Sequence, residues 1–438
     1  MLFGAKLPRW ATTEPNVTLP SAGLPSPKGV AHYGVYEAST AMGAYNHGPI
    51  ITSHDGTYAI SWYNGVLDES VANRVLFALS SDGETWSEPR VLFNTTAGSH
   101  RNQSRAGFPS GYNVGLENEP WLTGESGDLY AVASSWDVYQ RRGPGAEHAG
   151  PEAALVRKVE LGSGADIGAV ALGPVFWLAD EVPAGFAGYC NLTYRDEESL
   201  GSAVTRDLTR LRARLVSTVP ADDASAPNER SVYALPSSTP GALDLVMLMR
   251  SGVDKLPRMW AASSHCVPPP PSGENERAKS AAPQPCRPGT GINNYVLLPP
   301  PPTAARVDES DGGGDGGGEG SAWRCTAWTA PQPTTIPDSH SRTCAASLAD
   351  GRRWLVGAML PKNGDRTPLT LALSHDGVAW DAAWSLRGED TLPPIRFHGV
   401  PGFQYPSGMQ TADGQRLLVA YSVNKESIAV TSVPLESL

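Results

Sequence analysis

The sequence lacks several features that would assign it to a common functional class. It has no run of about 18 apolar residues, so we expect no membrane-spanning helix. It carries 34 basic against 45 acidic residues, without a basic cluster, which disfavours nucleic acid and anionic membrane surfaces as partners. Its five cysteines form no CxxC pair and have no histidine at zinc-ligand spacing. We therefore expect no metal site and no cofactor.

The sequence leaves the cellular compartment open. Its start, MLFGAKLPRW, lacks the apolar region of a secretory signal. Four Asn-x-Ser/Thr sequons, at Asn16, Asn94, Asn102 and Asn191, would suit a secreted protein, but a chain of this length also produces such triplets by chance. Disulfides are permitted but not implied. We expect a monomer.

A repeated unit is the main signal that the sequence does contain. Its 46 glycines, 39 prolines and twelve tryptophans indicate many short strands joined by turns. The unit consists of a turn, an apolar strand, a second strand and a Ser-x-Asp-Gly turn with a tryptophan. Its two clearest copies span residues 53–86 and 348–380.

The Ser-x-Asp-Gly segment has a mechanical role. Asp-Gly forms a tight turn, the aspartate accepts bonds from the turn's amides, and the tryptophan packs against the flank of the sheet. The complete copy consists of Ser80, Asp82, Gly83, Thr85 and Trp86, and the second of Ser374, Asp376, Gly377 and Trp380.

A third copy is predicted to be split. Ser263 and Trp328 would be the two ends of one such turn, with the Pro- and Gly-rich stretch 265–322 inserted between them. Tracts of this composition do not build a packed core, so we expect this insertion to lie outside the sheets. The remaining residues, about 380, allow six blades of about 60 residues each. The prediction is an all-β protein, a six-bladed β-propeller in one domain over residues 30–438.

With these turns, residues 30–438 resemble the sialidase (neuraminidase) superfamily, in which the turns are called Asp boxes. Asp boxes are specific for the fold and not for function. The resemblance implies a glycoside hydrolase with a tyrosine nucleophile, an assisting glutamate, an aspartic acid as acid/base and three arginines that bind the substrate carboxylate. Sialidases are an exception to the two-carboxylate rule of glycosidases. A neutral phenol suits a sugar whose anomeric carbon already bears a carboxylate.

Most of these parts have a counterpart in the sequence. The segment GFQYPSGMQ resembles the tyrosine segment and gives Tyr405 as nucleophile. NERSVYAL gives Glu229 as the assisting glutamate, and VLDESVANR gives Asp68 as acid/base, with Glu69 as the fallback. LDLVMLMR and GDRTPLTLALS resemble the segments of two clamp arginines, which fall on Arg250 and Arg366.

The first clamp arginine is missing. Its place reads YNHGPII and offers Asn46 or His47, and a neutral His47 could still donate a hydrogen bond to a carboxylate. An arginine supplies a permanent two-pronged donor that a histidine lacks. We therefore expect weak or no cleavage of ordinary sialosides at neutral pH. Glu119 precedes another inner strand and is a further candidate for binding substrate hydroxyls.

Each assignment has a structural alternative: a tyrosine bonded to backbone, an ion pair between Glu229 and Arg250, an exposed Arg366, a turn residue at Asp68 and a core histidine at His47. The leading prediction is a hydrolase of a terminal acidic sugar, with a glycan or glycoconjugate as partner. The alternatives are a catalytically silent propeller that binds glycan or protein, and an enzyme of the same fold acting on another sugar such as a uronic acid.

Overall fold

The fold of this protein is built almost entirely from strands. The computed structural model describes residues 7–65, 73–94, 114–137, 154–162, 168–181, 190–213, 215–217, 230–250, 257–268, 291–292, 295–298, 323–397 and 399–438, and all statements below refer to these. The described α-helices are α1 (Glu197–Leu200) and α2 (Ser202–Ala213), with short 3-10 turns at Pro20–Gly23, Glu389–Thr391 and Leu435–Ser437. The prediction of an all-β protein is confirmed.

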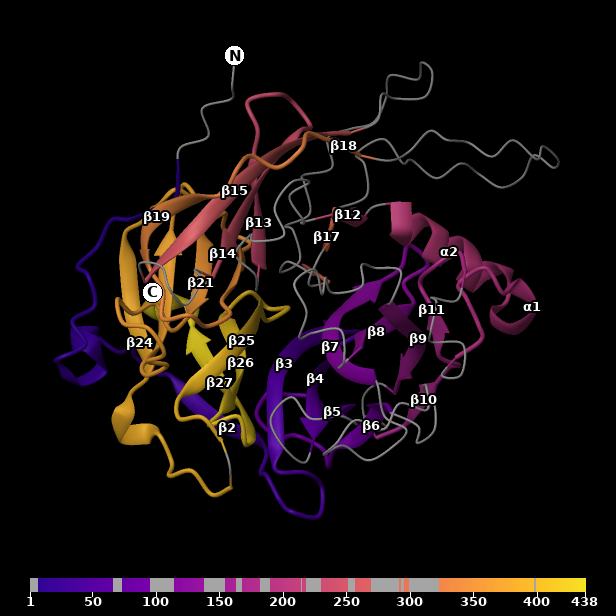
Figure 1. Cartoon of the computed structure of the whole chain (residues 1–438), viewed down its shortest axis with the longest axis horizontal. Helices are drawn as coiled ribbons and strands as arrows, with labels where there is room; N and C mark the ends of the chain where they lie inside the picture. The colour runs from indigo at the N-terminus through magenta and orange to yellow at the C-terminus, as the bar shows by residue number, and fades with distance from the viewer. Residues whose placement is uncertain are drawn as a thin grey trace.

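The strands form antiparallel sheets arranged as propeller blades (Figure 1). In chain order from the inner strand outward, the first blade is β3 (Tyr45–His54), β4 (Thr57–Gly65), β5 (Arg74–Ser80) and β6 (Arg90–Phe93). The second is β7 (Val114–Thr123), β8 (Leu129–Asp137), β9 (Ala154–Leu161) and β10 (Val170–Leu172), with β11 (Phe176–Trp177) also on β9.

Three further blades come from the second half of the chain. The first of them is β13 (Arg230–Pro236), β14 (Leu243–Met249) and β15 (Arg258–Val267), with β18 (Arg324–Cys325) and β19 (Gln332–Pro337) both on β15. The next is β20 (Cys344–Ser347), β21 (Arg353–Gly357), β22 (Leu369–Ser374) and β24 (Ala382–Arg387). The last is β25 (Phe403–Gln410), β26 (Arg416–Val423), β27 (Ser427–Pro434) and β2 (Ala31–Tyr36).

The last blade joins the two ends of the propeller. Its outer strand β2 comes from the N-terminal part of the chain and pairs with β27, whereas the other three strands are C-terminal. This pairing closes the ring through main-chain hydrogen bonds. Outside the blades, β1 (Arg9–Trp10) runs parallel to β23 (Ala379–Trp380).

The prediction of six blades is wrong for the described residues, which form five blade sheets. The inner strands follow one another in the order β3, β7, β16 (Gly291–Ile292), β13, β20, β25 and back to β3. At the third position stands a small sheet of β12 (Leu215–Ser217), β17 (Tyr295–Leu297) and β16. Dividing the chain evenly into blades failed because residues 197–213 are helical, and because two strands of this small sheet come from the insertion.

The insertion is therefore connected to the sheets more closely than expected. Residues 265–267 belong to β15, and β17 pairs with β12 from a distant part of the chain. The Pro- and Gly-rich tracts at 269–290 and 299–322 lie outside the described residues. Composition alone did not reveal the short strands between those tracts.

The Asp boxes have the geometry that their residues imply. Asp82 accepts hydrogen bonds from the amides of Glu84 and Thr85, at 2.8 Å each, and Ser80 Oγ accepts one from Gly83. Asp376 and Ser374 repeat this arrangement, and Trp380 is fully buried. A cross-mouth hydrogen bond joins the two ends of each Asp box, between the residue before the serine and the residue after the tryptophan. These pairs are Leu79 with Ser87 and Leu373 with Asp381.

The same cross-mouth bonds identify the split box and correct its register by one residue. Ser263 and Thr329 exchange two hydrogen bonds, so Ser263 corresponds to Leu79, and the box serine is Ser264 rather than Ser263. Trp328 stands at the tryptophan position, directly before Thr329, as predicted. The insertion therefore leaves and re-enters the blade within an Asp-box turn.

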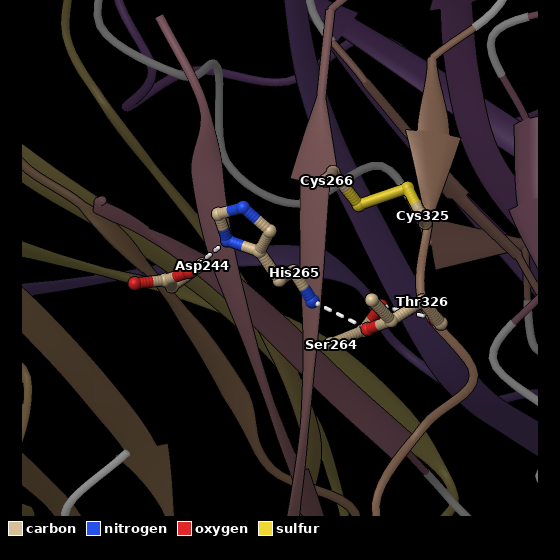
Figure 2. The surroundings of a disulfide bond; sticks show 6 residues. All are labelled: Asp244, Ser264, His265, Cys266, Cys325 and Thr326. Atoms are coloured by element: carbon tan, nitrogen blue, oxygen red, sulfur yellow. Dashed lines mark hydrogen bonds and ion pairs between the residues drawn. A yellow bond between two sulfur atoms is a disulfide. The ribbon is translucent and has the colours of Figure 1, made fainter. Parts of the chain in front are cut away.

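A disulfide holds the ends of this interrupted turn (Figure 2). Cys266 on β15 and Cys325 on β18 are register partners and are joined by a disulfide. Ser264 Oγ donates to the Thr326 carbonyl at 2.7 Å, and the His265 amide donates to Thr326 Oγ1 at 3.0 Å. On the other side of β15, His265 Nδ1 lies 2.6 Å from Asp244 on β14. Cys266 follows the box serine Ser264 by two residues, as Asp82 follows Ser80. The disulfide therefore joins the two ends of the insertion at the position that the aspartate has in an intact Asp box.

Helix α2 packs on the face of the second blade that points away from the first blade, on the right in Figure 1. Its buried Leu208 and Leu211 join the apolar cluster of that blade. Asp207, also buried, accepts hydrogen bonds from the amides of Glu125 and Ser126 and from Tyr130 Oη. This carboxylate thus organises the turn between β7 and β8 from outside the turn.

Candidate functional site

Three of the candidate site residues, His47, Glu119 and Tyr405, lie where inner strands bulge. The ladder of β3 shifts register between His47 and Ile50, that of β7 between Glu119 and Leu122, and that of β25 between Gln404 and Ser407. Each bulge contains a proline: Pro49, Pro120 and Pro406. Proline lacks an amide hydrogen for the ladder, and a bulge redirects the side chain beside it.

Tyr405 has an unusual backbone. Its φ is 50°, in the left-handed region, where a bulky residue is an outlier. Such a conformation costs about 1–3 kcal/mol and persists only where the surroundings impose it. The side chain is half-buried. This combination of strain and partial exposure is typical of functional residues.

The structure brings both predicted clamp arginines to Tyr405. Arg250 Nη1 lies 3.4 Å from Tyr405 Oη, at the outer limit of a hydrogen bond. Arg366 Cζ lies 5.8 Å from the centroid of the Tyr405 ring, and its Nη1 donates to Gln404 Oε1. Phe403 also bonds the Arg366 carbonyl, at 2.9 Å. Arg250 follows β14 and Arg366 precedes β22, so three blades meet at this tyrosine.

His47 is next to Tyr405 but is not exposed. The two ring centroids are 4.0 Å apart, and only 1% of His47 is accessible. His47 Nδ1 lies 2.7 Å from Ser422 Oγ, which donates its own proton to the Gln404 carbonyl at 3.2 Å. With the hydroxyl proton directed to that carbonyl, the hydrogen that His47 shares with Ser422 would come from Nδ1. Nε2 is then a lone pair, and it is buried without a hydrogen-bond partner among the described residues.

The surroundings keep His47 neutral. Burial lowers its pKa well below the usual value, and the charges of Lys425, Arg366 and Arg342 lower it further. Burial is therefore the main cause of the lowered pKa of His47, and Arg250 is not among the causes. The donating nitrogen is already used by Ser422, so this geometry does not support the prediction that His47 donates to a substrate carboxylate.

Arg342 and Lys425 are cations that the sequence analysis missed. Arg342 precedes β20 and makes no hydrogen bond within the described residues. Lys425 has a left-handed φ of 56° in the turn between β26 and β27, and its Nζ lies 5.6 Å from the centroid of the Tyr45 ring. Arg342 could have been found, since it shares with His47 and Tyr405 a position near the start of an inner strand. Nothing local marked Lys425.

Asn46 and Glu119 are both occupied by the protein. The amide of Asn46 donates to the carbonyls of Gly43 and Glu426 and accepts from Trp62 Nε1 and Asn64 Nδ2. Glu119 is fully buried on β7 and accepts a bond of 2.7 Å from Ser134 Oγ. These contacts favour a structural role for both residues.

Glu229, Asp68 and Glu69 lie outside the described residues. Within the part that is described, no three His, Cys, Asp or Glu side chains are grouped so that they could hold a metal ion. None of the described helices has the length and apolar character needed to cross a membrane.

Comparison with known proteins agrees with this architecture. Residues 319–418, which include one Asp box and Tyr405, match a family model described as a BNR repeat-like domain. A solved structure titled "Sialidase" superposes with a TM-score of 0.63 at 17% identity, over 98% of this chain and 35% of the other. The chain thus spans about a third of that protein's length. No curated protein matches the sequence.

Two further solved structures superpose less well. Trypanosoma rangeli sialidase in complex with sialic acid has a TM-score of 0.44 at 11% identity, over 94% of this chain and 60% of the other. NanB sialidase from Streptococcus pneumoniae has 0.44 at 9%, over 92% and 70%. These identities concern the fold alone. The protein is a β-propeller with BNR-type Asp-box repeats and the fold of the sialidases.

Proposed function

We propose that this protein is a sialidase-like glycoside hydrolase that acts on a terminal acidic sugar, with Tyr405 as its nucleophile. The observation that carries this proposal is the strained, half-buried Tyr405 with Arg250 near its hydroxyl and Arg366 near its ring. Guanidinium groups bind carboxylates through charge-assisted hydrogen bonds. A tyrosine in this setting is placed to face the anomeric carbon of an anionic sugar.

The mechanism follows from the chemistry of these groups. Tyr405 Oη attacks the anomeric carbon while Glu229 takes its proton, and the bond to the leaving group breaks. Asp68 protonates the leaving oxygen and afterwards removes a proton from the water that releases the sugar. The nearby positive charges stabilise the developing phenolate, because opposite charges attract strongly where water is excluded.

The carboxylate clamp differs from the one that the sequence predicted. Arg250 and Arg366 keep their predicted roles, and Arg342 takes the third place instead of His47 or Asn46. It is not bonded to other described residues, and its charge acts on His47, directly beneath Tyr405. Three arginines from two neighbouring blades, Arg250 from one and Arg342 and Arg366 from the next, then surround one carboxylate.

A hydrolase acting on a uronic acid is the second candidate. The observation that favours it is the neutral, buried His47 where a sialidase is expected to have an arginine. A different placement of the clamp charges would suit a sugar whose carboxylate lies elsewhere on the ring.

The test is a panel of fluorogenic glycosides that includes a sialoside, a glucuronide and neutral sugars. We expect hydrolysis of an acidic glycoside and a loss of kcat of about 100-fold or more in Tyr405→Phe. Tyr33→Phe, on the outer strand β2, is the matched control and should retain activity. Hydrolysis of neutral sugars alone, or full activity of Tyr405→Phe, contradicts the proposal. Binding of an acidic sugar without any hydrolysis identifies a silent glycan-binding propeller.

A further inference from the structure

The left-handed Tyr405 needs a local reason to keep its conformation. Three contacts hold the residue before it: Arg366 donates to Gln404 Oε1, Gln404 Nε2 donates to the Val400 carbonyl, and Ser422 Oγ donates to the Gln404 carbonyl. The last contact fixes the peptide bond that leads directly into Tyr405. Ser422 therefore acts on the backbone of the strained residue.

His47 completes this arrangement from the other side. Its Nδ1–H donates to Ser422 Oγ, and its ring faces the Tyr405 ring at 4.0 Å, with 35° between the planes. His47 thus contacts the Tyr405 ring directly. It also acts on the peptide bond before Tyr405, through the hydroxyl of Ser422. Edge contact with Tyr63 at 5.5 Å and a contact with Tyr45 at 5.9 Å limit movement of the imidazole.

We propose that His47 and Ser422 are positioning residues that hold Tyr405 in its left-handed conformation, with His47 fixed as the neutral Nδ1–H tautomer. This assignment deepens the proposed function, since it concerns the nucleophile of that same site. It differs from an ordinary core contact because the chain of bonds ends at the one strained bulky residue of β25.

The charges around His47 support a permanently neutral ring. Lys425 from the β26–β27 turn, Arg366 from the segment before β22 and Arg342 from the segment before β20 all oppose protonation, as does burial. Tyr45, Tyr63 and Tyr405 are the titratable rings that contact the imidazole.

The first experiment does not depend on activity. In the full chain labelled with ¹⁵N-histidine, the His47 signals are assigned by their loss in His47→Gln. We expect a neutral ring from pH 5.5 to 8, with Nδ1 protonated and Nε2 bare. The variant Ser422→Ala removes the acceptor and should shift the ring toward the other tautomer. A ring that titrates near pH 6.5, or that carries its proton on Nε2, overturns the assignment.

The second experiment tests the effect on catalysis. We expect Ser422→Ala to lower kcat about 10- to 100-fold with KM changed less than about 3-fold, because a small displacement of a reacting group has effects of this size. Ser432→Ala is the matched control: Ser432 is a buried serine on β27 that accepts a bond from Arg416, in the same blade. It should leave kcat unchanged. Equal kcat values for wild type and Ser422→Ala overturn the positioning role.

The proposed function and the positioning role can fail separately. If the wild type hydrolyses no glycoside in the panel, the proposed function is wrong, and a crystal structure of Ser422→Ala then decides the positioning role. Departure of Tyr405 from its left-handed φ, or separation of the two rings, supports it. An unchanged Tyr405 overturns it.

Discussion

The Cys266–Cys325 disulfide offers a prediction whose magnitude comes directly from the structure. The two cysteines are 59 residues apart, and the disulfide closes that loop in the unfolded chain. In the chain-entropy model, a loop of this length stabilises the folded state by about 4 kcal/mol. This is a large part of the 5–15 kcal/mol that separates folded from unfolded states in typical proteins.

The perturbation is the double substitution Cys266→Ser and Cys325→Ser. Hydrogen bonds of Ser263, Ser264 and His265 to the returning strand still join the two ends, so the native blade should persist. We therefore expect native circular dichroism and a loss of about 4 kcal/mol in the free energy of unfolding.

The assay is denaturant unfolding, with peptide mapping by mass spectrometry to establish the 266–325 bond in the wild type. Cys190→Ser, at a free and partly buried cysteine, is the matched control and should change stability by less than about 1 kcal/mol. If the bond is present but the double variant loses less than about 1 kcal/mol, the loop-closure reasoning is wrong. The bond also supports an oxidising compartment as a hypothesis for this protein.

Three further predictions concern single positions. Asp207→Ala should lower stability by about 3 kcal/mol in thermal unfolding, because it leaves the amides of the β7–β8 turn and Tyr130 without their acceptor; an unchanged midpoint contradicts this. Gly402→Ala should reduce the affinity for an acidic sugar several-fold in calorimetry, because Gly402 has a φ of 115° and the new Cβ would lie 2.6 Å from Arg366 Cβ and displace that arginine. An affinity equal to that of the wild type would contradict this displacement. The hydrogen bond from the Thr85 amide lowers the pKa of Asp82, so the ionised carboxylate stabilises the fold fully above about pH 4, and this stabilisation is lost as pH falls through the lowered pKa. In Asp82→Asn the free energy of unfolding should therefore depend less on pH on the acid side. A pH profile equal to that of the wild type would refute the assignment.

Local signals accounted for much of the fold. Asp-box turns depend on a few adjacent residues, so Asp82 and Asp376 could be assigned from the sequence, and so could the strands before and after them. The pairing of β2 with β27 joins strands from the two ends of the chain and closes the ring. The blade count failed where the chain left the repeat for α2 and the small sheet.

The candidate site shows a similar division. Resemblance of short segments pointed to Tyr405, Arg250 and Arg366, and the structure brings these three together. It also pointed to His47, but the sequence could not show that this histidine is buried and hydrogen-bonded to Ser422. Arg342 was missed although it stands near the start of an inner strand, as His47 and Tyr405 do, and Lys425 was missed because a cation in a turn carries no pattern of its own.

The sequence by itself determined the strand periodicity, the Asp-box turns and the short segments that carry Tyr405, Arg250 and Arg366. Each of these can be recognised from neighbours within a few positions. Only the tertiary structure decided which cations lie near His47 and Tyr405, which group is hydrogen-bonded to His47 and which distant segment completes the ring between β7 and β13. Those features depend on contacts between residues tens to hundreds of positions apart. Such contacts are selected by how whole blades pack, and no local pattern encodes them.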